Sequence, residues 1–270
     1  MTIKIYKGGL TKNIYIIMVN VLYLTLIPFK LILFVILLII GIFLLKNTNG
    51  DGNIKNLVII FFKIIVQFLL SYDIDISIED YNKYMRYLYS DEKFICVFNH
   101  ISALDGFLLL STFPKMGIVL NKQKCFDYIG YDDDANNKTG SIFVNVYKKS
   151  NVTNKIKETI YNRERGKSVL FISPTYALPE TEDNISKFIK KGAFVSKSKI
   201  LPIIIKYEDY SIIYNCEHEN VLEGIFKLFL FENYKIKIAV GDMIDPDENE
   251  SIEEYKERVY DIMNEQYKEM

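Results

Sequence analysis

The sequence has few of the residues that most often bind metals or form disulfides. Only three cysteines and two histidines occur among its 270 residues. Cys96, Cys125 and Cys216 have neither paired nor metal-ligand spacing, so we expect no zinc or other metal site. A disulfide framework is equally absent, which favours a reducing compartment and buried, inert thiols. Small disulfide scaffolds and zinc domains are therefore excluded.

The chain also lacks an excess of charge of either sign. Lys and Arg number 33 against 34 Asp and Glu, which gives a formal net charge of −1. A nucleic-acid-binding domain would be expected to carry a basic excess, so we expect no nucleic-acid partner. The balance is uneven, because residues 245–270 include ten acidic and three basic residues. The remainder is modestly basic, which suits anionic partners such as phosphate headgroups or coenzyme A.

Apolar residues are abundant and concentrated near the N-terminus. They make up 50% of the chain, which is enough to build a core. A length of 270 residues fits one main domain with an appendage better than two full domains. We therefore assign residues 1–72 to a helical membrane-anchoring segment and residues 73–270 to the main domain. The boundary lies where apolar sequence gives way to charged, turn-rich sequence.

Residues 13–45 are the longest apolar run, with Lys30 as their single charge. As a helix the run would span roughly 50 Å, whereas the hydrocarbon core of a bilayer is about 30 Å thick. Two arrangements are open. One is a tilted helix that spans the membrane, and the other is a pair of shorter helices that meet near Pro28 as a hairpin in one leaflet. A signal peptide is disfavoured, because the run starts late and no small-residue cleavage site follows it.

A second apolar segment covers residues 54–72. Its polar positions Lys63, Gln67 and Ser71 recur every four residues, which places them on one narrow stripe of a helix. Such a helix suits the membrane interface or packing against the first segment, and a buried core helix is the alternative. The lysines on either side of the apolar run indicate its orientation in the membrane only weakly. A hairpin would put both ends on the cytoplasmic side, in agreement with the unpaired cysteines, so we expect the main domain on the cytoplasmic face of a membrane.

From residue 93 onward, short apolar runs alternate with helical patterns. This order predicts an α/β domain with a mixed, mostly parallel sheet flanked by helices. We expect strands at residues 94–98, 169–172, 200–205 and 236–240, and helices near residues 104–111, 153–163 and 185–196. A last helix is predicted by the capping box of Ser251 and Glu254, followed by apolar residues at helical spacing: Ile252, Tyr255, Val259 and Met263.

A histidine and a carboxylate follow the predicted strand at residues 94–98. His100 and Asp105 are five positions apart, where a strand end leads through a loop into a helix. In α/β folds this is a common place for reactive groups. The Asp can accept a hydrogen bond from one imidazole nitrogen while the other nitrogen faces a substrate hydroxyl. The alternative is a structural histidine beside a helix-capping Asp.

The segment NHISALDGF at residues 99–107 resembles the NHx4D block of the glycerolipid acyltransferases, the family of 1-acylglycerol-3-phosphate acyltransferases. Four later segments are similar to further blocks of that family, in its order: GSIFVNV at 140–146, KKGAF at 190–194, LPIII at 201–205, and VGDMIDP at 240–246 before the capped helix. The resemblance runs from about residue 93 to the C-terminus. Five blocks in order are far more specific than one.

The resemblance implies roles for individual residues. His100 takes the place of the general base, which deprotonates an acceptor hydroxyl that then attacks a thioester. Asp105 would orient and support the base, while Ser102 and Gly106 would help to shape the turn. The remaining residues that we expect to bind substrate from matched blocks are Asn99, Gly140, Lys191 and Gly192.

The implied protein is a membrane-bound O-acyltransferase. It would transfer a fatty acyl chain to the hydroxyl of a lysophospholipid, most naturally 1-acylglycerol-3-phosphate or a related lysolipid, in phospholipid biosynthesis or remodelling. We expect no bound cofactor, with acyl-coenzyme A or acyl carrier protein as the donor substrate. Its partners would be membrane lipids, the acceptor and the donor. The alternative is a catalytically inactive, lipid-binding member of the same fold.

Two departures from the family pattern fall on acceptor recognition. Val146 stands where the second block usually has an arginine for the acceptor phosphate, and the candidate replacements are Lys148 and Lys149. After residues 169–172 the family has F-P-E-G-T, whereas this chain has S-P-T at residues 173–175. Glu180 is the candidate for the displaced carboxylate. Solvated surface lysines and an exposed loop acid are the alternatives. Because the predicted base and its partner are intact, a changed acceptor is more natural than lost chemistry.

Overall fold

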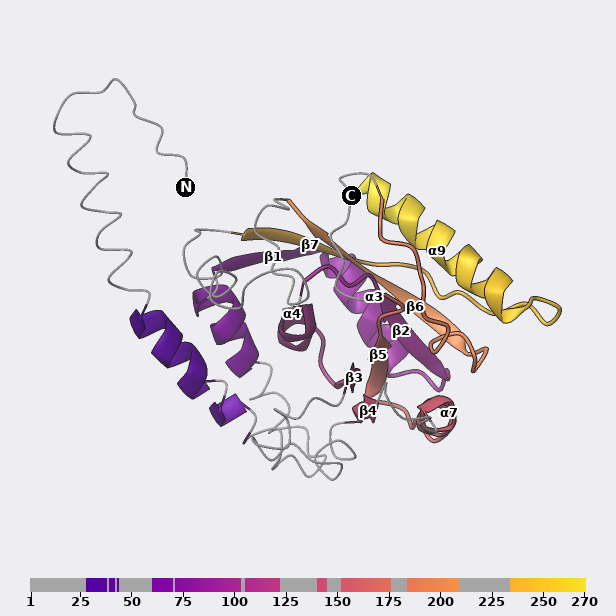
Figure 1. The fold of residues 1–270 in the computed structure, drawn as a ribbon, viewed down its shortest axis with the longest axis horizontal. Coiled ribbons are helices and arrows are strands. Elements are labelled where there is room, and N and C mark those ends of the chain that lie inside the picture. The colour runs from indigo at the N-terminus through magenta and orange to yellow at the C-terminus, as the bar shows by residue number, and fades with distance from the viewer. Residues whose placement is uncertain are drawn as a thin grey trace, which may run out of the picture.

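The computed structural model describes residues 28–37, 39–41, 43, 60–69, 71–102, 105–121, 140–144, 152–175, 184–208 and 234–270. Within them lies a seven-stranded sheet of order β1-β7-β6-β2-β5-β3-β4 (Figure 1). Every neighbouring pair is parallel except β6 and β7. The strands are β1 (Tyr72–Ile76), β2 (Phe94–Phe98), β3 (Met116–Asn121), β4 (Ile142–Val144), β5 (Val169–Ile172), β6 (Lys199–Tyr207) and β7 (Tyr234–Val240). The predicted mixed, mostly parallel sheet is confirmed.

Helices cover both faces of this sheet. They include η1 (Ile64–Leu69), α3 (Ile78–Leu88), α4 (Asp105–Thr112), α7 (Val152–Tyr161) and α9 (Ile252–Glu269). Phe94, Cys96 and Phe98 of β2 share a core with side chains of η1, α3 and α4. The intervening Ile95 and Val97 share a second core with side chains of α7 and α9. Because β2 is covered on both faces, its sequence is continuously apolar rather than alternating.

The carboxyl ends of β2, β5 and β6 meet at one edge of the sheet, which we call the carboxyl edge. β2 lies between β5 and β6 and is parallel to both. Because β6 and β7 are antiparallel, the amino ends of β7 and its parallel neighbour β1 lie at the same edge. The sheet thus gathers segments that are far apart in sequence, in the place where α/β folds bind ligands.

An N-terminal pair of helices packs beside this sheet. Residues 28–43 are helical at each position that the structure describes, and residues 60–63 form a second helix that continues into η1. A Cβ on Gly41 would lie 3.3 Å from the ring of Phe61 and 3.5 Å from that of Phe62, so the two helices are in close contact. Phe62 and Ile65 are buried in the core that also contains β1 and α4 residues. The second apolar segment therefore packs against the first, one of the arrangements that we expected.

Membrane spanning is not observed in the described part of the chain. No helix there is both long enough and apolar enough to cross a bilayer. The choice between a spanning helix and a one-leaflet hairpin depends on residues 1–27 and 44–59, which lie outside the described residues. Both arrangements stay predictions.

Most of the predicted elements of the main domain are confirmed. Strands occupy all four predicted places, and α4, α7 and α9 lie where helices were expected. The capping box of α9 is present: the Ser251 Oγ accepts from the Glu254 amide at 3.2 Å, and the Glu254 Oε2 accepts from the Ser251 amide at 2.7 Å. Tyr255, Val259 and Met263 are buried, as their helical spacing predicts.

The predicted helix at residues 185–196 is wrong. Ile185 and Phe188 are buried at helical spacing, but their segment is irregular and ends in a turn at residues 192–196. The backbone amides of Ile189 and Lys190 donate to the Pro174 carbonyl, at 3.1 and 2.8 Å, and not to carbonyls four residues earlier. The apolar spacing was correct for burial, but the backbone partners are at the end of β5.

Candidate active site

His100 and Asp105 form a hydrogen-bonded pair at the carboxyl edge. His100 lies in the loop after β2, and Asp105 is the first residue of α4. The imidazole Nδ1 is 2.8 Å from the carboxylate Oδ2. The Asp105 side chain is fully buried, whereas the His100 side chain is 25% exposed. The pair thus combines an enclosed carboxylate with a ring that solvent or a ligand can reach.

Backbone amides fix the position of the Asp105 carboxylate. Its Oδ2 also accepts from the amides of Ile101 and Ser102, at 2.7 and 2.9 Å. These bonds close the loop around the first turn of α4, where the helix dipole also favours a negative charge. An oxygen that accepts from two amides acts as an acceptor toward the ring too, so Nδ1 carries the proton. The lone pair of the imidazole is then on Nε2, the nitrogen that a base would use.

Tyr207, the last residue of β6, donates to the other carboxylate oxygen. Its hydroxyl lies 2.6 Å from the Asp105 Oδ1. Burial, and next the charge of Asp105, hold the pKa of Tyr207 well above its ordinary value, so the phenol stays protonated. Sequence reasoning did not find this residue, because 102 positions separate it from Asp105. The signal that could have found it is its place at the end of an apolar strand next to β2.

Asn99 holds the end of β2 to β6. Its side-chain amide donates to the Ile205 carbonyl and accepts from the Ile205 amide, both at 2.7 Å. Only 1% of the residue is exposed. The side chain is thus used within the sheet, and the substrate contact that the motif predicts gains no support from this geometry.

The segment after β5 replaces the acidic block of the resembled family with a neutral turn. The Ser173 hydroxyl lies 3.2 Å from the Thr175 hydroxyl and also accepts from the Thr175 amide at 3.2 Å. The Lys190 ammonium donates to the Thr175 carbonyl at 2.9 Å. Thr175 is 1% exposed. No carboxylate therefore stands at residues 173–175 of this edge.

Gly140 is not brought to His100. It lies next to Ser168, which precedes β5, and so at the opposite edge of the sheet. Its φ is +75°, and a Cβ there would come within 2.6 Å of the Ser168 Cβ. Backbone geometry therefore explains this glycine, and the expectation that it lines the substrate site gains no support from its position.

The surroundings of Lys191 and Gly192 that the structure shows do not involve the pair. The Lys191 ammonium forms an ion pair of 2.7 Å with Glu253, in the first turn of α9, and its side chain is 62% exposed. Gly192 has open space where a Cβ would be, so no close contact requires a glycine there. The other predicted binding residues, Lys148, Lys149 and Glu180, lie outside the described residues, as does Val146.

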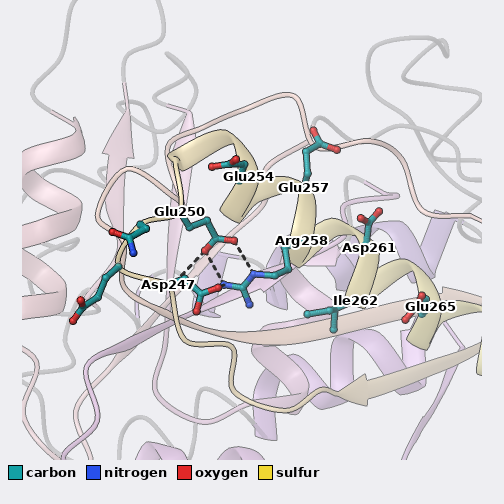
Figure 2. A pocket seen from close by; sticks show the side chains of 10 residues that line it. Asp247, Glu250, Glu254, Glu257, Arg258, Asp261, Ile262 and Glu265 are labelled. Atoms are coloured by element: carbon teal, nitrogen blue, oxygen red, sulfur yellow. Dashed lines mark hydrogen bonds and ion pairs between the residues drawn. The ribbon is translucent and has the colours of Figure 1, made fainter.

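A separate acidic pocket lies on α9 and the turn before it (Figure 2). Arg258 crosses it and donates to both carboxylate oxygens of Glu250 at 2.7 Å. None of the described residues that the sequence predicted for the active site lines it. Across the described ranges, no three side chains are grouped so as to hold a metal ion.

The same architecture occurs in an enzyme of known structure. The crystal structure of PlsC, the 1-acyl-sn-glycerophosphate (LPA) acyltransferase from Thermotoga maritima, matches this chain with a TM-score of 0.58 at 14% identity. The match covers 94% of this chain and 97% of that one. This chain has an acyltransferase fold. No protein-family model and no curated protein matches its sequence. The acyltransferase fold agrees with the resemblance read from the motifs, and His100 and Asp105 lie at the carboxyl edge of its sheet.

Proposed function

We propose that this protein is a membrane-associated O-acyltransferase that esterifies the hydroxyl of a lysophospholipid. The observation that carries the proposal is the bond of 2.8 Å between the His100 Nδ1 and the buried Asp105 Oδ2, at the carboxyl edge of an acyltransferase fold. This bond orients the ring and leaves its second nitrogen as a base on the exposed side.

The proposed reaction needs no covalent intermediate on the enzyme. The His100 Nε2 takes the proton of the acceptor hydroxyl while that oxygen attacks the thioester carbonyl of acyl-coenzyme A or acyl carrier protein. Asp105 stabilises the imidazolium that forms. Collapse of the tetrahedral intermediate makes the ester and breaks the C–S bond. The leaving thiolate takes the proton back from the imidazolium, so the base is restored.

An exposed apolar helix face supports the proposed membrane association. Large apolar side chains of residues 28–43 and 60–64 recur every three or four positions with 41–71% of their surface exposed: Phe29, Ile32, Leu33, Val35, Ile36, Ile39, Ile40, Phe43, Ile60 and Ile64. The opposite side of the same helix, at Leu31, Phe34 and Leu37, packs on the protein core. Contiguous exposed apolar surface is typical of lipid or protein contacts. A lipid surface would bring both the acyl chain and the lysolipid to the site at high local concentration.

The neutral turn at residues 173–175 favours a second candidate, a lipid-binding protein without turnover. The turn is closed on itself and held by Lys190, so it offers no carboxylate from the third block. An enzyme with a changed acceptor preference remains our primary proposal, because the His100–Asp105 pair is fully assembled.

The test is thiol release from oleoyl-coenzyme A by the purified protein in detergent, with lysophosphatidic acid, other lysophospholipids and glycerol 3-phosphate as acceptors. We expect acceptor-dependent release, with His100→Ala lower by on the order of 10² or more. His218→Ala, which removes the other histidine of the chain, is the matched control and should keep the rate. Equal rates for wild type and His100→Ala would overturn the role of His100. Binding of lysolipid without any thiol release would establish the second candidate.

A further inference from the structure

The loop that carries His100 is attached to β6 at two points. Asn99, before the histidine, exchanges two hydrogen bonds with the backbone of Ile205. Asp105, after it, accepts from the Tyr207 hydroxyl at 2.6 Å. Ile205 and Tyr207 are two positions apart on β6, so their side chains point to the same face of the sheet and into the same core. The strand β6 thus holds both ends of the loop.

The two oxygens of the Asp105 carboxylate have different partners. The Oδ2 accepts from the imidazole and from two backbone amides, and the Oδ1 accepts from the phenol. Rotation about the Cβ–Cγ bond would move both oxygens and stretch the bonds to each of them. The phenol on Oδ1 therefore adds to the hold of the two amides on Oδ2 and helps to keep Oδ2 in line with the ring of His100.

The phenol is held in the form that can donate. Tyr207 is 2% exposed and lies between β2 and β7 in the sheet. Its pKa is raised by burial and by Asp105, and Tyr72 of the edge strand β1 acts in the same direction. A hydrogen bond with Ser102 acts against them. Among the described residues, the titratable groups bonded to the carboxylate are His100 from the loop and Tyr207 from β6, and Tyr72 acts on Tyr207 through its charge.

We propose that Tyr207 is a positioning residue for His100, acting through Asp105. The kinetic part of this inference rests on the proposed function, whereas its effect on the ring of His100 does not. Removing the phenol oxygen takes a donor from the anion, which raises the proton affinity of the His100–Asp105 pair whichever atom holds the proton. It also loosens the orientation of the base without touching either substrate.

The first experiment is an NMR titration of His100 in the His218→Gln background, where it is the single histidine. We expect Tyr207→Phe to raise the pKa of the imidazole by about half a unit or more. The ¹⁵N shifts of the ring should show a weaker preference for the Nδ1-protonated tautomer. Tyr84→Phe is the matched control. Tyr84 lies on α3, is buried like Tyr207, and donates its hydroxyl hydrogen to the Pro114 carbonyl at 2.6 Å rather than to Asp105.

The second experiment measures thiol release by the same variants. We expect Tyr207→Phe to lower kcat by on the order of 10-fold or more, with KM for donor and acceptor within about twofold, and to move the acid limb of kcat/KM to higher pH. Tyr84→Phe should leave the pH profile in place.

The two experiments separate the two claims. No thiol release by wild type with any acceptor would sink the proposed function, and the titration alone would then judge Tyr207. An unchanged titration and tautomer of His100 in Tyr207→Phe would overturn the inference. Equal shifts in Tyr207→Phe and Tyr84→Phe would overturn it too, because the effect would then reflect general loosening of the core.

Discussion

Asn99 and Ile205 exchange two hydrogen bonds of 2.7 Å, so a side-chain amide completes the pairing of two strands where one of them ends. The side chain imitates the backbone of a further strand residue. It lets the chain leave β2 one residue before the histidine while the Ile205 amide and carbonyl stay paired in a buried place.

Replacement of Asn99 should therefore destabilise the fold. Asn99→Ala leaves both polar groups of Ile205 without these partners, and each unmade buried bond costs about 1–3 kcal/mol. We expect the free energy of unfolding to fall by about 2–4 kcal/mol in denaturant titrations monitored by circular dichroism. Asn249→Ala is the control, because Asn249 is exposed, and a surface change of this kind stays within about 0.5 kcal/mol. Similar stabilities for the two variants would contradict the structural task assigned to Asn99.

Arg163 binds the end of α3, although 75 positions of sequence separate it from Leu88. It is 5% exposed, donates to the carbonyls of Glu92 and Leu88 at 2.6 and 2.7 Å, and stacks over the ring of Phe94. Arg163→Lys loses the planar fork and the stacking. We expect a loss of about 1.5–3 kcal/mol in the free energy of unfolding, the range for hydrogen bonds of a charged group. Arg165→Lys, at an exposed position two residues on, should unfold like the wild type. Equal effects would show that the fork is not needed.

The ion pair on α9 predicts a pH dependence of stability. Hydrogen bonds from Arg258 lower the pKa of Glu250 below its ordinary value of 4.5 in the folded protein. A depressed carboxyl pKa contributes stability that is complete above the unfolded value and is lost as the pH falls through the folded value. The free energy of unfolding should thus fall less steeply below about pH 4.5 in Glu250→Gln than in the wild type. Glu248→Gln makes the same charge change at an exposed site and should keep the wild-type slope. A wild-type slope in Glu250→Gln would rule out the ion pair as its source.

The exposed apolar face predicts sensitivity of lipid binding to charge. Ile32 and Ile39 are 59% and 58% exposed on the N-terminal helix. We expect Ile32→Asp/Ile39→Asp to reduce co-flotation of the protein with phosphatidylcholine vesicles several-fold, because each carboxylate would have to enter the interface. Ile78→Asp is the control, since Ile78 is 81% exposed at the start of α3. Unchanged flotation of the double variant would remove this face from the membrane proposal.

The sequence predicted the central strands and missed those at the sheet margins. Residues 94–98 and 169–172 are buried on both faces and so are continuously apolar. The edge strand β1 reads YDIDI, with a buried first residue and exposed Asp73 and Asp75. Charges that protect a sheet edge made this strand look like turn-rich sequence. The strand β4 has three residues, too few for any periodicity.

The residues of the candidate site also differ in whether the sequence could predict them. His100 and Asp105 were predicted because they are five positions apart, on one short segment between β2 and α4. Tyr207 was not found, because its contact depends on the order of strands in the sheet, which sequence pattern alone does not give. Gly140 was placed at the site by its motif, yet its motif reports a backbone requirement at the other edge. Local motifs thus predicted the chemistry, while the sheet topology decided which residues support it.

The contact between Phe62 and Phe107 has a mechanical consequence. Their ring centroids are 5.7 Å apart. One ring belongs to the N-terminal helical pair, and the other belongs to the helix whose first residue is Asp105. The N-terminal helical pair therefore packs directly on α4, the helix that ends the reactive loop. If the apolar face rests on a bilayer, the imidazole stands at a set height above it, and acceptors would be selected by the depth at which they carry their hydroxyl.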